Sequence, residues 1–291
     1  MAPTETIFST DPYEPVVNGE YAGVALQPCS TEPHCEVVNL FGCQLAKVRR
    51  AEAVKEVYRL MEQRGTTCRY VVTPNIDHVV TLMERADLRR AYADASLVVT
   101  DGMPVVLASR LLGRPVPERI SGTDLLIGIL AAAESHGGLR VYLLGAMPGV
   151  ADQAAVNIER SWPEIEVVGT NSPPFGFEKD PEYQANLLEE IRNARPDLLV
   201  VGLGAPKQEL WVHAHREEID AAAVCIGASI DFIAGNKKRA PLWMQVWGLE
   251  WLHRMLTEPR RLFRRYLRDA WLFPPIVWRE WRKLRKERSA N

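Results

Sequence analysis

The sequence repeatedly alternates between short runs of aliphatic, often β-branched residues and longer stretches with helical periodicity, and this alternation constrains the fold more than any other feature. The stretches at 50–64, 123–136, 150–160 and 206–218 have the spacing of apolar residues that amphipathic helices show. Such alternation is typical of proteins in which helices cover both faces of a mostly parallel sheet. We therefore predict a Rossmann-like α/β fold whose strands are EVVNL (36–40), RYVVT (69–73), SLVVT (96–100), RVYLL (140–144), IEVVG (165–169), DLLVVGL (197–203) and AAVCIG (222–227).

Pattern and composition divide the chain into three parts. Residues 1–35 are rich in Pro, Thr, Ser and Glu without sustained periodicity, so we expect a flexible N-terminal extension there. Residues 36–240 form the expected α/β domain. No strand pattern remains in residues 241–291, which we expect to form a basic helical appendage broken into three segments at Pro259 and at Pro274–Pro275.

Charge is unevenly distributed along the chain. The net charge is only -2, yet residues 251–291 hold 12 Lys and Arg against 4 Asp and Glu, which leaves about -10 on residues 1–250. Six of the eight tryptophans also lie between Trp243 and Trp281. A basic, aromatic appendage indicates an anionic partner, either the phosphates of a substrate or a lipid surface. The acidic body argues against nucleic acid.

Cysteine usage and hydropathy indicate a cytoplasmic protein. The five cysteines form no CxxC pair, so neither a disulfide framework nor a zinc site is expected. Residues 1–15 lack the charged and apolar regions of a secretory signal. No run of 18 apolar residues occurs, although AWLFPPIVW (270–278) is apolar enough to lie in a membrane interface. We expect any membrane contact to be peripheral.

Polar residues follow two of the expected strands. Ligands of open α/β sheets bind beyond the carboxyl ends of the strands, so these positions are candidates for chemistry. Thr73 and Asn75, in VVTPNIDH, could bind a sugar hydroxyl, or they could simply form a turn with an Asn cap. Asp101 could be a general base, because burial raises the pKa of a carboxyl, or it could belong to an Asp-Gly turn.

Two glycine turns follow other strands. Gly145, in LLGAMPGVAD, and Gly204, in VVGLGAPKQELW, precede expected helices whose N-termini could bind a diphosphate, with Lys207, Gln208 and Glu209 close behind. Tight packing of helix on strand explains the glycines equally well. Neither turn carries the third glycine and trailing acid of a dinucleotide fingerprint. The sequence also has no Asp-x-Asp for a nucleotide-bound metal ion, and no metal or cofactor is expected.

Taken together, six segments resemble one known family. In chain order they are TPNIDH, TDGMPVV, ERISGTDL, GLGAPKQE, DFIAGNKKRAP and GLEWLHRMLTEPRRLFRRY. This combination resembles the WecG/TagA/CpsF family of bacterial glycosyltransferases, in order from about Val37 to about Phe273. The expected extension and the tail after Phe273 exceed the usual pattern of that family.

The resemblance implies an inverting, metal-independent hexosyltransferase of the cytoplasmic membrane face. Such enzymes move a sugar from a UDP-sugar to a lipid-linked acceptor, typically GlcNAc-diphospho-undecaprenol, in the synthesis of cell-surface polysaccharide or teichoic acid. The expected donor sugar is of the N-acetylmannosamine type, with a glucose type as the alternative.

The resemblance also implies roles for individual residues. Asp101 matches the proposed general base of the family. Pocket positions of the family fall on Thr73, Asn75, Arg119 and Gln208. Arginines thought to reach the diphosphate of the donor fall on Arg254, Arg261 and Arg264.

Spacing within the appendage supports a common face for its arginines. Arg254, Arg261, Arg264 and Arg268 are separated by seven, three and four positions, so they would share one face if the helix continued through Pro259. An ordinary solvated helix face is the alternative. An NAD(P)-dependent oxidoreductase and a non-catalytic membrane-associated scaffold also remain open as functions, and a homo-oligomer is possible.

Overall fold

The computed structural model describes residues 35–63, 65, 67–241, 244 and 249–290, without the side chains of Arg261 and Ala290. The expected N-terminal extension, residues 1–35, therefore lies almost wholly outside the described residues.

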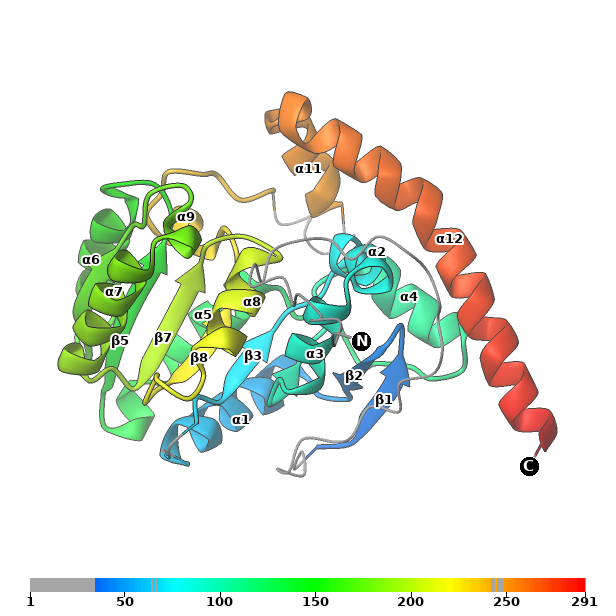
Figure 1. Cartoon of the computed structure of the whole chain (residues 1–291), viewed down its shortest axis with the longest axis horizontal. Helices are drawn as coiled ribbons and strands as arrows, with labels where there is room; N and C mark the ends of the chain where they lie inside the picture. The colour runs from blue at the N-terminus through cyan, green and yellow to red at the C-terminus, as the bar shows by residue number, and fades with distance from the viewer. Residues whose placement is uncertain (1–34, 64, 66, 242–243, 245–248, 291) are drawn as a thin grey trace, which may run out of the picture.

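A six-stranded sheet forms the centre of the molecule, and every neighbouring pair of its strands is parallel. The strand order is β4-β3-β8-β7-β5-β6 (Figure 1). The predicted parallel α/β fold is confirmed, because strands buried on both faces need the near-continuous aliphatic runs that the sequence shows. The strands are β3 (Tyr70–Val72), β4 (Leu97–Val98), β5 (Leu139–Gly145), β6 (Ile165–Asn171), β7 (Leu198–Gly202) and β8 (Ala222–Cys225).

The first aliphatic run forms a strand, but it lies outside the parallel sheet. Strand β1 (Val37–Leu40) pairs antiparallel with β2 (Cys43–Ala46) in a separate hairpin. The two residues between them, Phe41 and Gly42, both have positive φ, at 55° and 77°. Positive φ at both positions is the geometry that lets a two-residue turn follow the twist of its strands. The sequence pattern did not reveal β2, because CQLA has no β-branched residue.

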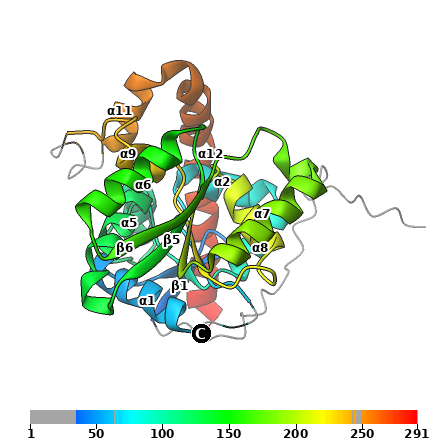
Figure 2. The ribbon, with the colours of Figure 1, turned by 90° about the vertical axis from the view of Figure 1, so that its left-hand side faces the viewer.

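Helices cover both faces of the sheet, as Figure 2 shows in a view along it. Alternate strand residues supply two separate cores: Leu198 and Val200 face one side, whereas Leu199 and Val201 face the other. The first core packs against α1 (Arg50–Glu62), α5 (Gly122–Ala131), α6 (Val150–Ser161) and α9 (Ser229–Ile233). The second packs against α2 (Ile76–Glu84), α3 (Ala86–Ala93), α4 (Met103–Leu111), α7 (Pro181–Ala194) and α8 (Lys207–Ala214).

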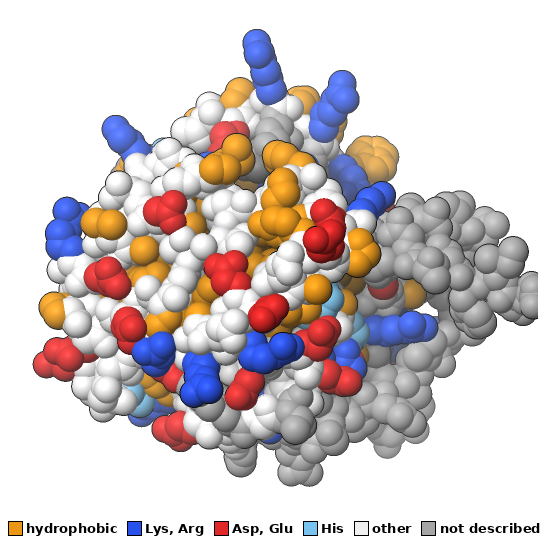
Figure 3. All heavy atoms as spheres, turned by 60° about the vertical axis from the view of Figure 1, so that its left-hand side comes forward, with side chains coloured by type: hydrophobic (Ala, Val, Ile, Leu, Met, Phe, Trp, Pro, Cys, Tyr) orange, Lys and Arg blue, Asp and Glu red, His pale blue; other side chains and the backbone are white. Residues whose placement is uncertain are grey.

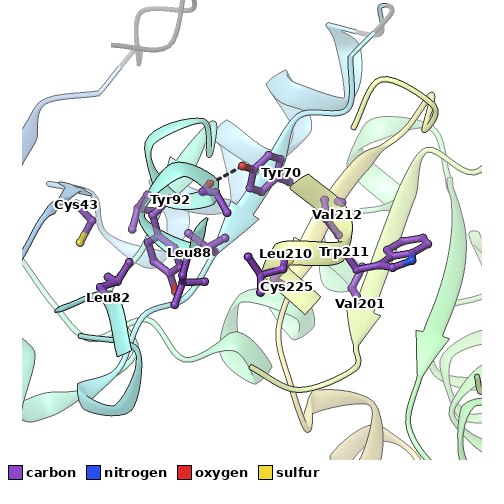
Figure 4. Close-up of a cluster of buried hydrophobic side chains, with 14 of the residues drawn as sticks. Cys43, Tyr70, Leu82, Leu88, Tyr92, Val201, Leu210, Trp211, Val212 and Cys225 are labelled. Carbon is purple, nitrogen blue, oxygen red and sulfur yellow. Dashed lines mark hydrogen bonds between the residues drawn. The ribbon is translucent and has the colours of Figure 1, made fainter. Parts of the chain in front are cut away.

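Three large aromatic side chains fill the second core (Figure 4). Tyr70, Tyr92 and Trp211 are each at most 1% exposed. Burying a large apolar side chain contributes roughly 1.5–3 kcal/mol, so these residues hold α3 and α8 firmly on the sheet. The Tyr70 hydroxyl donates a hydrogen bond to the carbonyl of Ala91, so this buried polar group is satisfied.

Within the described residues, the appendage contains α11 (Glu250–Thr257) and α12 (Pro259–Ala290). The predicted break at Pro259 is confirmed. The predicted break at Pro274–Pro275 is wrong, because α12 continues through both prolines. Both prolines are exposed, whereas Phe273 and Leu284 on the other side of the helix are buried in the second core. Water can satisfy the carbonyls that the prolines free, and packing of the opposite face keeps the helix continuous.

Helix α12 is docked along the body of the protein (Figure 1). The Phe273 ring lies 5.9 Å from that of Phe41 in the hairpin turn. Arg268 pairs with Glu84 of α2 at 2.5 Å, and further along the helix the Arg288 guanidinium donates to the Leu112 carbonyl at 3.3 Å. Apolar and polar contacts thus fix the helix at several points along its length.

Candidate functional site

A cavity of about 300 Å³ lies beyond the carboxyl ends of β3, β4 and β8, where the appendage meets the α/β body. Its walls come from the loops after these three strands, from the starts of α2 and α5, and from α11 and α12. Four of the predicted site residues line it: Asn75, Asp101, Arg119 and Arg254.

Asp101 stands at the wall of this cavity, three residues beyond β4. Its backbone N–H donates to the Pro74 carbonyl at 2.9 Å, which ties the loop after β4 to the loop after β3. Burial, with a smaller contribution from Glu250, raises the pKa of the Asp101 carboxyl to about 7 against the opposing effects of Arg119, Arg254 and the Gly122 N–H. A carboxyl with this pKa exchanges a proton near neutral pH, as a general base must.

The start of α5 approaches the Asp101 carboxylate closely. Gly122, the first residue of the helix, donates its backbone N–H to that carboxylate. A Cβ at Gly122 would lie 3.0 Å from the Cβ of Ile226, in the loop after β8. A larger residue would push the helix away from both strand ends, which explains the glycine in ERISGTDL.

Arg119 connects the body to the appendage. Its guanidinium donates to Glu250 of α11 at 2.8 Å and lies 3.7 Å from Asp124 of α5. Arg239 bonds the same Asp124 at 2.8 Å. Sequence reasoning missed Asp124, Arg239 and Glu250, although ERISGTDL, DFIAGNKKRAP and GLEWLH contain them. The local spacing of these residues carries no signal of an ion pair between segments over 100 positions apart.

Asn75 lines the cavity and caps α2. Its side-chain oxygen accepts from the backbone N–H of His78 at 3.4 Å and lies 2.9 Å from the His78 ring Nδ1. The other ring nitrogen of His78 lies 3.4 Å from Glu209, which is fully buried. Burial lowers the pKa of His78, but the neighbouring carboxylates of Glu209, Asp77 and Asp101 together outweigh burial, so the pKa is raised. His78 therefore links Asn75 to a buried carboxylate.

Gln208, Glu209 and Thr73 lie one layer behind the cavity wall. Gln208 donates to Glu209 at 2.7 Å and accepts from the Gly227 N–H at 3.0 Å. The Thr73 hydroxyl donates to the Cys225 carbonyl at 3.1 Å. None of the three lines the cavity. Their predicted role in substrate binding stays a prediction, and in this structure their polar atoms brace the loops after β3 and β8.

The glycine turns after β5 and β7 also lie outside the cavity wall. A Cβ at Gly145 would come within 2.5 Å of the Gly202 carbonyl carbon, so the close approach of two strands accounts for this glycine. Gly204 has a φ of +83°, which suits glycine at a turn. Lys207 pairs with Glu178 at 2.9 Å. The predicted phosphate contacts of Gly145, Gly204 and Lys207 therefore have no support from cavity geometry.

The expected common face of the appendage arginines is absent, because α11 ends at Thr257 and the next residue, Glu258, is not helical, with a φ of −129° and a ψ of 56°. Arg254 of α11 lines the cavity, with its guanidinium 5.9 Å from the Phe232 ring. Arg264 of α12 is exposed and does not line it. The side chain of Arg261 lies outside the described residues. Arg268 pairs instead with Asp77 and Glu84 of α2.

Helix α12 presents other residues to the cavity. Arg265, Tyr266 and Asp269 line it, together with Asp77 from the start of α2. Burial, and then the charge of Asp77, raise the pKa of Asp269 to about 6. Sequence reasoning missed these residues, because the break before Pro259 decides which face of α12 meets the body.

No group of three or more His, Cys, Asp or Glu side chains in the described part of the chain could hold a metal ion. No described helix is long and apolar enough to cross a membrane.

Comparison with known proteins shows the family of this chain. The profile of the glycosyl transferase WecG/TagA/CpsF family matches residues 38–287, beyond the expected limit near Phe273. A protein of Bacillus spizizenii is 34% identical over 193 residues, which span 66% of this chain and 72% of that protein. One of Staphylococcus aureus is 28% identical over 254 residues, which span 86% and 95%. Both are named N-acetylglucosaminyldiphosphoundecaprenol N-acetyl-beta-D-mannosaminyltransferase. The match to the family profile covers most of the chain, including Asp101, Arg119 and both helices around the cavity, and the chain therefore belongs to the WecG/TagA/CpsF family of glycosyl transferases.

Proposed function

We propose that this chain is an inverting glycosyltransferase that moves a sugar from a UDP-sugar to a sugar linked through diphosphate to a polyprenol. The names of the two relatives support N-acetylmannosamine as the transferred sugar and N-acetylglucosaminyl-diphospho-undecaprenol as the acceptor. The observation that carries the proposal is Asp101, a carboxyl with a pKa of about 7 in a cavity that also contains Arg119 and Arg254.

The reaction is a single displacement. Asp101 accepts the proton of the acceptor hydroxyl while the hydroxyl oxygen attacks the anomeric carbon of the donor sugar. The bond from that carbon to the UDP oxygen breaks, and its electron pair leaves with the diphosphate. Because the attack comes from the face opposite UDP, the anomeric configuration inverts. Asp101 can be ionised near pH 7 because Arg119, Arg254 and the Gly122 N–H offset part of the cost of burial.

Negative charge develops on the departing diphosphate, and this chain offers cations rather than a carboxylate pair to meet it. Arg254 lies on the cavity wall in α11. A planar guanidinium binds phosphate oxygens through two hydrogen bonds, which a lysine ammonium cannot match in geometry. We propose that Arg254 stabilises the leaving group and that no metal ion is required.

The exposed face of α12 supports peripheral attachment to the inner face of the cytoplasmic membrane. Phe263, Leu267, Trp271 and Trp278 are 57% to 80% exposed, and their spacing of four, four and seven places them on one side of the helix. Basic residues flank this side, including Arg260, Arg264, Arg282 and Arg285. Aromatic and basic side chains on one helix face are typical of contact with anionic lipid. We propose that this face, opposite the buried Phe273 and Leu284, rests on the bilayer.

The charge distribution over the body favours this assignment over a nucleic-acid-binding surface. On the face shown in Figure 3, acidic and basic side chains are interspersed, without the continuous basic stripe that a duplex requires. No observation on the described residues favours the dehydrogenase, since neither Gly145 nor Gly204 lines the cavity.

A transfer assay tests the proposal. The purified protein is incubated with a panel of UDP-sugars and a short-chain GlcNAc-diphospho-lipid, and UDP release and the new disaccharide are followed by mass. We expect turnover with UDP-N-acetylmannosamine and loss of about 10²–10⁴-fold in kcat for Asp101→Asn, which cannot accept the proton. Absence of product with every donor would contradict the proposal, as would near-normal turnover by Asp101→Asn.

A further inference from the structure

Two buried polar atoms one helical turn apart on α12 are left without partners beside the cavity. Asp269 is only 3% exposed, and its Oδ1 accepts no hydrogen bond from any residue that the structure describes. Within the same limits, the Nε–H of Arg265 donates to none. Both residues line the cavity. Residues four apart on a helix are neighbours on its surface, so the acceptor and the donor lie on the same face of α12.

The described residues around these two atoms do not provide the missing hydrogen-bond partners. The terminal nitrogens of Arg265 face Asp77, at 3.8 Å, and its guanidinium lies 5.4 Å from the Tyr266 ring. The charge of Asp77 raises the pKa of Asp269, whereas the charges of Arg265 and Arg268 lower it, and no described residue donates a hydrogen bond to Oδ1. A buried, unpaired polar atom costs about 1–3 kcal/mol, more when it is charged, and such a cost at a cavity wall indicates a group that a ligand satisfies.

We propose that Asp269 and Arg265 form a subsite for a sugar hydroxyl. The hydroxyl donates its proton to the Asp269 carboxylate, and the same oxygen accepts the Nε–H of Arg265. This inference rests on the proposed transferase function and deepens it: α12 recognises substrate, in addition to closing the cavity and meeting the membrane.

Other ligand groups fit this pair less well. A phosphate would be repelled by the negative charge of Asp269 at close range. A metal ion would be repelled by the positive guanidinium of Arg265 and would have a single carboxylate oxygen as its ligand. A trans amide points its N–H and C=O in opposite directions, whereas Asp269 and Arg265 lie on the same helix face. A hydroxyl is both donor and acceptor at one oxygen, which is what adjacent acceptor and donor atoms require.

The test pairs protein variants with substrates that lack one hydroxyl. The values of kcat/KM are measured for wild type, Asp269→Ala and Asp269→Asn with two series, UDP-sugars that each lack one hydroxyl and acceptor lipids that each lack one hydroxyl. We expect one analogue in one series to lose about 10- to 100-fold with wild type. With Asp269→Ala the difference between this analogue and its parent should shrink, because only the contact with the Arg265 Nε–H remains. The series in which the effect appears identifies the donor or the acceptor as the source of the hydroxyl.

Controls separate recognition from folding. Glu287→Gln removes an exposed carboxylate from the same helix, so it should keep both the wild-type rate and the wild-type selectivity. Asp269→Asn keeps the shape of the side chain, so it remains informative if Asp269→Ala does not fold, and its selectivity should be weakened. Arg265→Lys keeps the positive charge near Asp77 but loses Nε–H, so it should weaken the same preference.

The outcomes distinguish the subsite from the function on which it rests. If wild type is active and the Asp269 variants keep its full selectivity against every analogue in both series, the subsite is wrong and the transferase stands. If wild type transfers no sugar from any donor, the proposed function fails, and the subsite fails with it.

Discussion

At the scale of single residues, the proposed transfer reaction depends on the ionisation of Asp101. Burial raises its pKa to about 7, and a general base must be ionised to act. The value of kcat/KM should therefore fall about tenfold for each pH unit below 7 and level off above pH 8. A pH profile of the purified enzyme measures this directly. A rate that stays constant between pH 5 and pH 8 would contradict the assignment.

A substitution of Glu250 can show whether the pH profile of kcat/KM reports the ionisation of Asp101. Its carboxylate raises the pKa of Asp101, and it also pairs with Arg119, which lowers the same pKa. Glu250→Gln removes the first effect and leaves the guanidinium less neutralised, so both changes lower the pKa. The acidic limb of the profile should shift to lower pH. Glu287→Gln is the matched control and should leave the limb in place, whereas an upward shift in Glu250→Gln would disprove the electrostatic account.

At the scale of secondary structure elements, packing of α12 decides whether the cavity is complete. Phe273 is 9% exposed and contacts Phe41, whereas Phe263 on the same helix is 57% exposed. Phe273→Ala should lower the free energy of unfolding by about 3–5 kcal/mol and reduce turnover, because Arg265 and Asp269 depend on the same docking. Phe263→Ala should change stability by less than about 0.5 kcal/mol. Chemical denaturation of both variants measures this difference, and equal effects would show that α12 is not held by its buried face.

Elements also show how far the sequence could predict the structure. The aliphatic runs predicted the parallel strands because full burial on both faces demands such residues. The positions of Asn75 and Asp101 in loops at the same edge of the sheet could be predicted, because the carboxyl ends of parallel strands lie at one edge. Contacts between distant segments could not be predicted in this way. The pairing of Arg119 with Glu250, and the placing of Gln208 behind the wall, depend on how elements dock and carry no local pattern. The course of α12 through its prolines was decided by tertiary burial of Phe273 and Leu284.

At the scale of the whole molecule, the body supplies the proposed base, and the appendage supplies arginines, a second carboxyl and the proposed membrane face. The protein should bind vesicles that contain anionic lipid, and binding should weaken as salt rises. Removal of two exposed tryptophans by Trp271→Ala with Trp278→Ala should reduce binding severalfold. Phe175→Ala removes an aromatic residue that is 94% exposed but lies outside the appendage, and it should bind as wild type does. Co-sedimentation with vesicles measures binding by the wild type and by both variants. Equal losses of binding in the two variants would contradict docking through α12.

The central claim is that one cavity between body and appendage carries out a single displacement with Asp101 as the base. The anomeric configuration of the product reports this most directly, because one displacement must invert the configuration that the sugar had in the UDP donor. The one-bond carbon–hydrogen coupling at the new anomeric centre, measured by NMR on the purified disaccharide lipid, distinguishes the two outcomes. We expect the inverted anomer as the sole product. A retained anomer would require two successive displacements, and it would contradict the role proposed for Asp101.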